Sequence, residues 1–155
     1  MTTSLRISVA DDEADMREYY QRMLTHLGHR VVSCSPNGRQ LVDECLRQLP
    51  DLVITDIKMP ELDGLHAAAQ IGQKYPVPVI LVSAHHSPDT AEQANSACVQ
   101  IFLTKPIKLT DLAPAIDFAR RRFDWQRNIR LEETEMRQAR QQRHRPDLAE
   151  QGALP

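Results

Sequence analysis

The sequence has no apolar run long enough to cross a membrane. The longest run, residues 77–82, is interrupted by Pro78 and is far shorter than the roughly 20 residues that a membrane-spanning helix needs. The first residues also lack a basic segment followed by an apolar one, so no secretory signal is predicted. We therefore expect a cytoplasmic protein without a membrane partner.

Cysteine is scarce. Cys34, Cys45 and Cys98 are odd in number and widely spaced. This spacing excludes a disulfide framework and the paired cysteines of a zinc site, and it predicts reduced, mostly buried thiols.

The chain also lacks a strong net charge, but its charges are unevenly distributed. Its 19 Lys and Arg against 21 Asp and Glu give a net charge of −2 over 155 residues. Residues 1–119 hold 10 basic and 15 acidic residues, net −5, whereas residues 120–155 hold 9 basic and 6 acidic residues, net +3. With an apolar share of 41%, the sequence predicts one globular domain, acidic in character, followed by a basic C-terminal segment.

Short runs rich in Val, Ile and Leu recur along the first 103 residues. They cover residues 5–10, 30–34, 52–55 and 78–82, with a weaker fifth run at 99–103. Their apolar residues are nearly continuous and do not alternate with polar ones, which is typical of strands buried on both faces of a parallel sheet.

Segments of helical periodicity separate these runs. The apolar spacing predicts two helices that end at Gly28 and at Pro50, and a third marked by residues 65–72. A fourth helix is predicted over residues 88–97, and a last one beginning after Thr110 as N-cap. Strands and helices that alternate five times predict an α/β fold with a doubly wound parallel sheet and an extended C-terminal helix.

Polar residues follow the strands whose carboxyl ends could line one crevice. In chain order they are Asp11 and Asp12, Asp56, Ser83 and Lys105. Binding and chemistry in open parallel sheets take place just beyond the carboxyl ends of the strands. Three carboxylates gathered there would repel each other unless a cation lay between them, and Mg²⁺ prefers oxygen ligands. The pattern predicts a Mg²⁺ site in which Lys105 and Ser83 can contact a second negative group.

Each of these residues also has an ordinary interpretation when it is taken alone. Asp11 and Asp12 suit the first turn of a helix, Asp56 suits the start of a loop, and a lysine before Pro106 suits a solvated loop. Their occurrence in chain order at consecutive strand ends favours a site.

The residues after Asp56 extend the pattern into a longer motif. Residues 55–64 read Thr-Asp-Ile-Lys-Met-Pro-Glu-Leu-Asp-Gly, and the pairs Ser83-Ala84 and Lys105-Pro106 follow. Together with Asp11 and Asp12, these motifs make residues 4–123 resemble the receiver domain of two-component response regulators, the CheY-like superfamily. The resemblance implies a flavodoxin-like fold with five parallel strands in the order 2-1-3-4-5.

The resemblance also implies a chemistry for the site. Asp56 would accept a phosphoryl group from a histidine kinase or a phosphotransfer protein and become an acyl phosphate. Asp11, Asp12, Asp56 and the backbone carbonyl of Lys58 would hold Mg²⁺, and Lys105 and Ser83 would contact phosphoryl oxygens. Because an acyl phosphate is reversible and hydrolysable, we expect a switch and not a turnover enzyme.

Further positions match the switch and the loops of the resembled family. Ser83 and Phe102 would form the switch pair, although Phe102 also suits a plain core position on a strand. The loop positions are Met59 and Pro60, which would fix the course of the loop, Gly64, which would permit a tight turn, Ala84, which would leave room for the phosphoryl group, and Pro106.

Residues 124–155 form a second region, a helical extension with a disordered end. No glycine occurs between Asp111 and His144, and Pro114 falls in the opening turn, so one helix of some 35 residues and about 50 Å is predicted. Trp125, Ile129 and Met136 recur at helical spacing and suggest a homodimer seam. A charge-laced, fraying helix is the alternative, because Glu132 interrupts the seam.

We therefore expect a phosphorelay response regulator that signals through a downstream protein partner. The alternative is a nucleic-acid-binding regulator of transcription or antitermination that acts through the Arg-rich C-terminal helix. The glutamates among these arginines and the short remainder after Arg145 make nucleic-acid binding the weaker hypothesis. A receiver that acts constitutively through protein contacts is a third class, disfavoured because the full set of site residues is present.

Overall fold

The computed structural model describes residues 3–84 and 98–144. The chain divides into two compact units, with the boundary between Phe123 and Asp124. Within the described residues, no helix combines the length and the apolar character needed to cross a bilayer.

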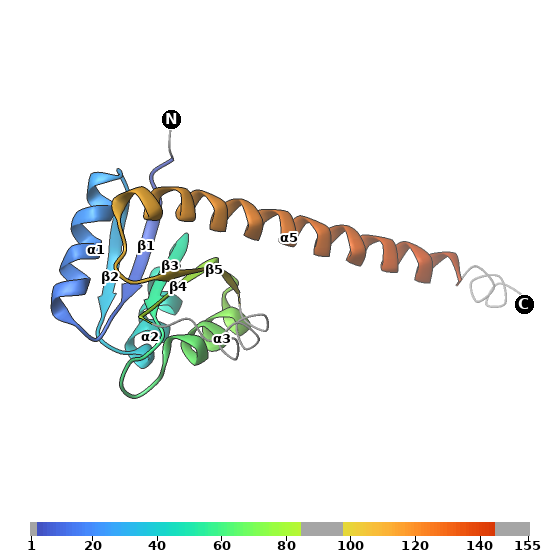
Figure 1. The fold of residues 1–155 in the computed structure, drawn as a ribbon. Helices are drawn as coiled ribbons and strands as arrows, with labels where there is room; N and C mark the ends of the chain where they lie inside the picture. Colours follow the sequence, from blue (N-terminus) through green and yellow to red (C-terminus); the bar gives the residue numbers. More distant parts are fainter. Residues whose placement is uncertain (1–2, 85–97, 145–155) are drawn as a thin grey trace, which may run out of the picture. The chain divides into compact units, whose positions relative to one another are not determined.

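The first unit contains a five-stranded parallel sheet (Figure 1). Its strands are β1 (Arg6–Ala10), β2 (Arg30–Ser35), β3 (Leu52–Asp56), β4 (Val79–Ser83) and β5 (Val99–Thr104), in the order β2-β1-β3-β4-β5. This confirms the predicted fold class and strand order, and each strand lies within one residue of its predicted limits. The central strands β1, β3 and β4 are almost wholly buried, as their continuous apolar runs predict.

Four helices are described: α1 (Ala14–His26), α2 (Gly38–Gln48), α3 (Gly64–Lys74) and α5 (Leu109–Arg143). The helix predicted over residues 88–97 lies outside the described residues. The 35-residue length of α5 agrees with the prediction, but its predicted start is wrong. The backbone carbonyl of Lys108 accepts bonds from the amides of Asp111 and Leu112, both at 3.0 Å, so Thr110 lies inside the first turn and is not the N-cap.

Helices cover both faces of the sheet and create two apolar cores (Figure 1). On one face, Tyr20 and Leu24 of α1 and Leu112 and Ile116 of α5 pack against β1, β3 and β4. On the other face, the core is supplied by α2 and α3, which lie side by side. The sheet is thus packed on both faces, and its carboxyl edge carries the polar residues considered below.

The three cysteines are free. Cys45 is buried and Cys98 half-buried, but Cys34 is exposed, so the prediction of mostly buried thiols is wrong for Cys34. The reason is its position on β2, the edge strand of the sheet, which is covered less than the central strands.

Candidate functional site

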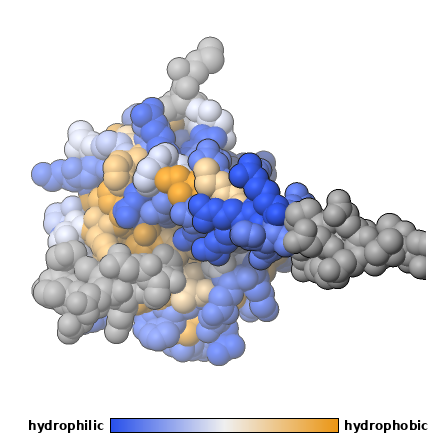
Figure 2. Space-filling model, turned by 90° about the vertical axis from the view of Figure 1, so that its right-hand side faces the viewer, coloured by the Kyte–Doolittle hydropathy of each residue, from blue (hydrophilic) through white to orange (hydrophobic). Residues whose placement is uncertain are grey.

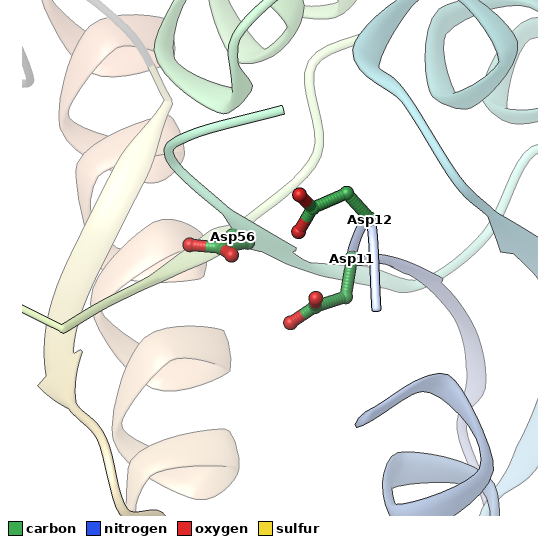
Figure 3. A group of neighbouring side chains, drawn as sticks. All are labelled: Asp11, Asp12 and Asp56. Atoms are coloured by element: carbon green, nitrogen blue, oxygen red, sulfur yellow. The ribbon is translucent and has the colours of Figure 1, made fainter. Parts of the chain in front are cut away.

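Three aspartates meet at the carboxyl edge of the sheet. Asp11 and Asp12 directly follow β1, and Asp56 is the last residue of β3. Because β1 and β3 are adjacent and parallel, their ends coincide, with Ala10 paired to Thr55. One carboxylate oxygen from each aspartate lies within 4.8 Å of the other two, and Figure 3 shows the three side chains pointing to the same side.

Lys105 brings a positive charge to this cluster. Its Nζ lies 3.1 Å from Asp11 Oδ2 and 3.2 Å from Asp56 Oδ2. The backbone amide of Lys105 donates to the carbonyl of Ser83 at 2.9 Å, which continues the pairing of β5 with β4 by one residue. The sheet itself therefore positions the lysine opposite the two carboxylates.

The second oxygen of each buried carboxylate is held by the backbone. The amide of Glu13 donates to Asp11 Oδ1 at 2.9 Å, and the amide of Ile57 donates to Asp56 Oδ1 at 2.8 Å. Both Oδ2 atoms are thereby directed at Lys105. Asp12 is exposed, whereas the side chains of Asp11 and Asp56 are only 0% and 10% accessible.

Burial and charge shift the pKa values of this group in ways that follow from its geometry. Burial raises the pKa of Asp11, and the nearby charge of Asp56 adds to that rise; the amide of Glu13 and Lys105 oppose it. Burial by itself would lower the pKa of Lys105, but its hydrogen bonds to Asp11 and Asp56, together with their charges, raise it. Lys105 is therefore firmly protonated and compensates part of the buried negative charge.

The donor set suits a small hard cation. Three carboxylates from two strand ends offer oxygen ligands from one side, and the exposure of Asp12 leaves the cluster open to water. Mg²⁺ is bound in proteins in this way, by one or two carboxylates with several retained waters. The residues present therefore fit such an ion.

Comparison with known proteins places this arrangement in a family. A family model of the response regulator receiver domain matches residues 7–117. The chain belongs to this family. Receiver domains are phosphoacceptor modules of two-component systems.

Several relatives share the receiver domain. The chain is 37% identical over 118 residues to the transcriptional regulatory protein PdtaR of Mycobacterium tuberculosis, an alignment that covers 76% of this chain and 58% of PdtaR. It is 38% identical over 105 residues to a protein-glutamate methylesterase/protein-glutamine glutaminase of Archaeoglobus fulgidus, covering 66% of this chain and 30% of that enzyme. The chain thus spans less than two thirds of the length of these relatives.

Solved structures agree with the receiver fold. The signal receiver domain of NarL from Mycobacterium tuberculosis superposes with a TM-score of 0.71 and 31% sequence identity, covering 76% of this chain and 98% of that domain.

The loop after Asp56 explains the glycine of the receiver motif. A Cβ on Gly64 would lie 1.9 Å from the backbone oxygen of Asp56, and the amide of Gly64 donates to the carbonyl of Ile57 at 2.7 Å. The glycine is thus needed for close approach to the site strand, at the first residue of α3. Met59 accepts a weak bond from the Thr55 hydroxyl through its sulfur, at 3.9 Å.

The other receiver motif residues lie where their strands end. Ser83 is the last residue of β4 and is half-buried, and Ala84 after it is exposed. Pro106 follows Lys105 through a cis peptide bond. Lys58 and Pro60 are exposed in the loop between β3 and α3. Phe102, on β5, is half-buried and packs against the core formed with α2 and α3.

Several receiver residues around the site were not singled out from the sequence. Arg17 Nη1 donates to the backbone oxygen of Asp11 at 2.8 Å, and the Tyr19 hydroxyl donates to the carbonyl of Ile107 at 2.8 Å, which ties α1 to the loop after Lys105. The Thr55 hydroxyl donates to the backbone oxygen of Asp56 at 2.9 Å. Tyr20 is wholly buried beneath the acidic cluster, and burial followed by the charges of Asp11 and Asp56 raises its pKa. Only Thr55 lies in the receiver motif, so the sequence contained no signal for the others.

Proposed function

We propose that this chain is a phosphoacceptor switch and that Asp56 is the residue phosphorylated. The observation that carries the proposal is the shared contact of Lys105 Nζ with Asp11 and Asp56, at 3.1 and 3.2 Å, beside a third carboxylate. This is the charge arrangement that phosphoryl transfer needs, since the reaction depends mainly on positioning and on neutralising phosphoryl oxygens.

Mg²⁺ is the cofactor that the donor set supports. Asp11, Asp12 and Asp56 would hold it through carboxylate oxygens, together with the backbone carbonyl of Lys58. When bound, the ion supplies positive charge to the phosphoryl oxygens during transfer. The role of Asp11 and Asp12 is to hold and orient the ion. Asp11 is buried, whereas Asp12 is exposed, so the cluster is open to the phosphoryl donor on the side of Asp12.

The covalent step is a substitution at phosphorus. A carboxylate oxygen of Asp56 attacks the phosphorus of a phosphohistidine, an O–P bond forms, and the N–P bond breaks. The histidine nitrogen keeps the electron pair of that bond and takes up a proton. Lys105 balances the charge that moves onto the phosphoryl oxygens, and the amide of Ile57 holds the other Asp56 oxygen, at 2.8 Å, in a fixed orientation.

The switch would run from Ser83 to Phe102. Ser83 lies next to Lys105 at the strand ends, where its hydroxyl would bond a phosphoryl oxygen, and the small Ala84 would leave room for the group. Phe102 packs on the side of the sheet covered by α2 and α3, and it also borders a hollow of about 440 Å³ between the edge strand β5 and α5, whose apolar walls include Ile107 and Phe118. Figure 2 looks onto the side of the receiver unit that carries β5, where apolar surface is gathered. A change at Ser83 would be passed to this hollow through Phe102.

The phosphoryl donor would be a sensor histidine kinase or a phosphotransfer protein, and the output would be a contact with a downstream protein. The loops beside Asp56 would keep one conformation when the partners bind, because they contain Met59, Pro60 and Pro106. The receiver unit, residues 4–123, would carry the reaction, and residues 124–155 would form the extension. Its predicted disordered end, residues 145–155, lies outside the described residues.

A second candidate function is regulation through nucleic acid. PdtaR is described as a transcriptional regulator, and the arginines of α5 beyond residue 124 are exposed. Glutamates at positions 132, 133 and 135 interrupt this basic surface, which weakens an electrostatic contact with phosphates. A gel shift with RNA and DNA at several salt concentrations tests the idea, because a real contact loses affinity as salt rises.

Phosphorylation of the purified chain tests the main proposal. With acetyl phosphate or phosphoramidate and Mg²⁺, intact-mass spectrometry should show the gain of one phosphoryl group, which hydroxylamine removes because an acyl phosphate is labile to it. The gain should disappear in Asp56→Asn and on chelation of the metal.

Asp63→Asn is the matched control for the loss of a carboxylate. Asp63 lies seven positions further on, caps α3 by accepting from the amide of His66 at 2.7 Å, and is not part of the acidic cluster. An asparagine keeps that cap. Phosphorylation that survives in Asp56→Asn, or that vanishes only in Asp63→Asn, would show that Asp56 is not the acceptor.

A further inference from the structure

The helix α5 carries a stretch with little buried surface. Between Asp124 and Arg143, no side chain is fully buried: Ile129 is half-buried, and Trp125 and Met136 are 64% and 62% accessible. A helix of this length is only marginally stable in water by itself, because most helical stability in proteins comes from packing an apolar face. The stretch is regular throughout, and packing its apolar residues against a partner would stabilise it.

Four of its apolar residues follow a heptad repeat, which Glu132 interrupts. Trp125, Ile129, Glu132, Met136 and Ala139 are separated by four, three, four and three residues. In heptad notation, Ile129, Met136 and, at the end of the stretch, Arg143 occupy position a, and Trp125, Glu132 and Ala139 occupy position d. Positions a and d form the seam along which two helices wind around each other.

We propose that residues 124–143 pair with the same residues of a second copy of this chain, as a parallel two-stranded coiled coil. Ile129 and Met136 each meet their own counterpart in this arrangement, and Trp125 closes the seam at its N-terminal end. The partner is a second copy because a parallel pairing in register places Glu135 of each chain beside Arg140 of the other.

The complementarity lies at Glu135 and Arg140. Glu135 occupies position g and Arg140, five residues later, occupies position e. In a parallel coiled coil, g of one helix faces e of the next heptad on the other, so the dimer gains this ion pair twice. An antiparallel pairing places g opposite g and e opposite e, and the g residues Asn128, Glu135 and Gln142 include no cation. Glu135 would then have no cationic partner on the other helix, so the Glu135–Arg140 pair is specific to the parallel arrangement.

Glu132 sets the strength of the dimer. It occupies a core d position, where the two copies bring like charges together. The seam is also short, at little more than two heptads. The dimer is therefore weak and depends on protein concentration, and replacing Glu132 with an apolar residue should tighten it.

Sedimentation equilibrium of the full, unphosphorylated chain tests the pairing. At about 100 µM, the mass should approach twice the 17.7 kDa of one chain. Ile129→Asp should raise the dissociation constant about 100-fold or more, because it buries an unpaired charge in the seam, and Glu132→Leu should lower it about tenfold or more.

Leu131→Asp is the matched control. Leu131 is also an exposed apolar residue of the same helix, at 55% accessibility, but it occupies position c, away from the seam. The same charge placed there should leave the dissociation constant within about twofold. Circular dichroism of each variant confirms that the receiver fold is intact. Equal loss in both aspartate variants, or a monomeric wild type at that concentration, would overturn the proposal.

A charge exchange tests the orientation. Glu135→Arg and Arg140→Glu should each weaken the dimer, and the double variant should recover the affinity of the wild type, because the swapped pair is again complementary. Failure of the double variant to recover would overturn the parallel arrangement. Dimers that appear only after RNA or DNA is added would also overturn the proposal and favour the nucleic-acid function. Sedimentation measures the mass of the unphosphorylated chain, so the outcome for the dimer does not depend on whether Asp56 is the phosphoacceptor.

Discussion

The ammonium of Lys105 lies 3.2 Å from Asp56 Oδ2, the oxygen that the backbone leaves unclaimed. Lys105 thus occupies the position at which a phosphoryl group on Asp56 would place its negative oxygens. The same nitrogen contacts Asp11, so one cation balances two carboxylates before any ligand is bound. Lys105 is therefore expected to affect metal binding and phosphoryl transfer in opposite directions.

Lys105→Met tests this expectation. Methionine keeps most of the length of the side chain but removes its charge. The affinity for Mg²⁺ should rise, because a competing cation is gone, whereas the rate of phosphorylation by acetyl phosphate should fall on the order of 100-fold with the loss of transition-state charge stabilisation. Calorimetry measures the affinity for Mg²⁺ and mass spectrometry measures the phosphoryl group gained, so the two effects can be separated. A variant in which both quantities fall together would contradict this role for Lys105.

Asp11→Asn should stabilise the fold in the absence of metal. Burial raises the pKa of Asp11 above its ordinary 3.8, so the folded chain binds this proton more tightly than the unfolded chain. The proton bound by Asp11 therefore stabilises the folded chain. This stabilisation is fully present below pH 3.8 and is lost as the pH rises through the folded-state pKa of Asp11. At pH 7 the variant should exceed the wild type by about 1 to 2 kcal/mol in free energy of unfolding, and the difference should shrink in acid.

Urea denaturation between pH 4 and pH 7 measures this difference, with EDTA present. Asp12→Asn is the control, because Asp12 belongs to the same acidic cluster but is exposed; its free energy of unfolding should change by no more than about 0.5 kcal/mol. Both variants should lose Mg²⁺ affinity. An Asp11→Asn variant that is less stable than the wild type at pH 7 would show that the contact with Lys105 outweighs burial.

The adjacent tyrosines of α1 should respond to the same substitution with opposite signs. The Tyr20 hydroxyl is wholly buried and has no hydrogen-bond partner among the described residues, so Tyr20→Phe should raise the free energy of unfolding by about 1 kcal/mol. The Tyr19 hydroxyl donates to Ile107 at 2.8 Å, so Tyr19→Phe should lower it by about 1 kcal/mol. Urea midpoints of the two variants make the comparison, and a loss of stability in Tyr20→Phe would reveal a buried partner for its hydroxyl.

Gly64→Ala should disable the site, whereas Gly72→Ala in the same helix should not. The new Cβ at position 64 would lie 1.9 Å from the backbone oxygen of Asp56, and neither backbone segment can give way cheaply. At position 72 the nearest atom is the sulfur of Cys98, at 3.0 Å, which can rotate. We expect Gly64→Ala to lose several kcal/mol of stability, about 3 or more, together with phosphorylation. Thermal unfolding and the acetyl phosphate assay measure both, and a fully active Gly64→Ala would show that the loop has room to move.

The sequence was sufficient for the elements whose information is local. Runs rich in Val, Ile and Leu identified all five strands, most clearly the central β1, β3 and β4, because a central parallel strand must be apolar on both faces. The residues at the strand ends could likewise be grouped in advance, because parallel strands bring their carboxyl ends to one edge, and the structure brings Asp11, Asp12, Asp56 and Lys105 together there.

The contacts that depend on exact backbone placement could not be anticipated in this way. The start of α5 depends on which carbonyl accepts from its first amides, and that carbonyl belongs to Lys108. Judged by residue type alone, Thr110 is an equally good N-cap. The bond from Tyr19 to Ile107 joins residues 88 positions apart, and no local pattern reports it. Gly64 was identified from the motif, but its reason, the approach to Asp56, became visible only with the strand in place.

The backbone amides that hold Asp11 Oδ1 and Asp56 Oδ1 have a consequence for the cost of ligand binding. Each carboxylate would otherwise rotate about its Cβ–Cγ bond and would lose that freedom when a ligand arrives. Here the entropy has already been lost during folding, as part of the loops that follow β1 and β3. The acidic edge of the receiver is thus preorganised, and Lys105, whose flexible chain reaches in from β5, is the group left to move when the charge on Asp56 changes.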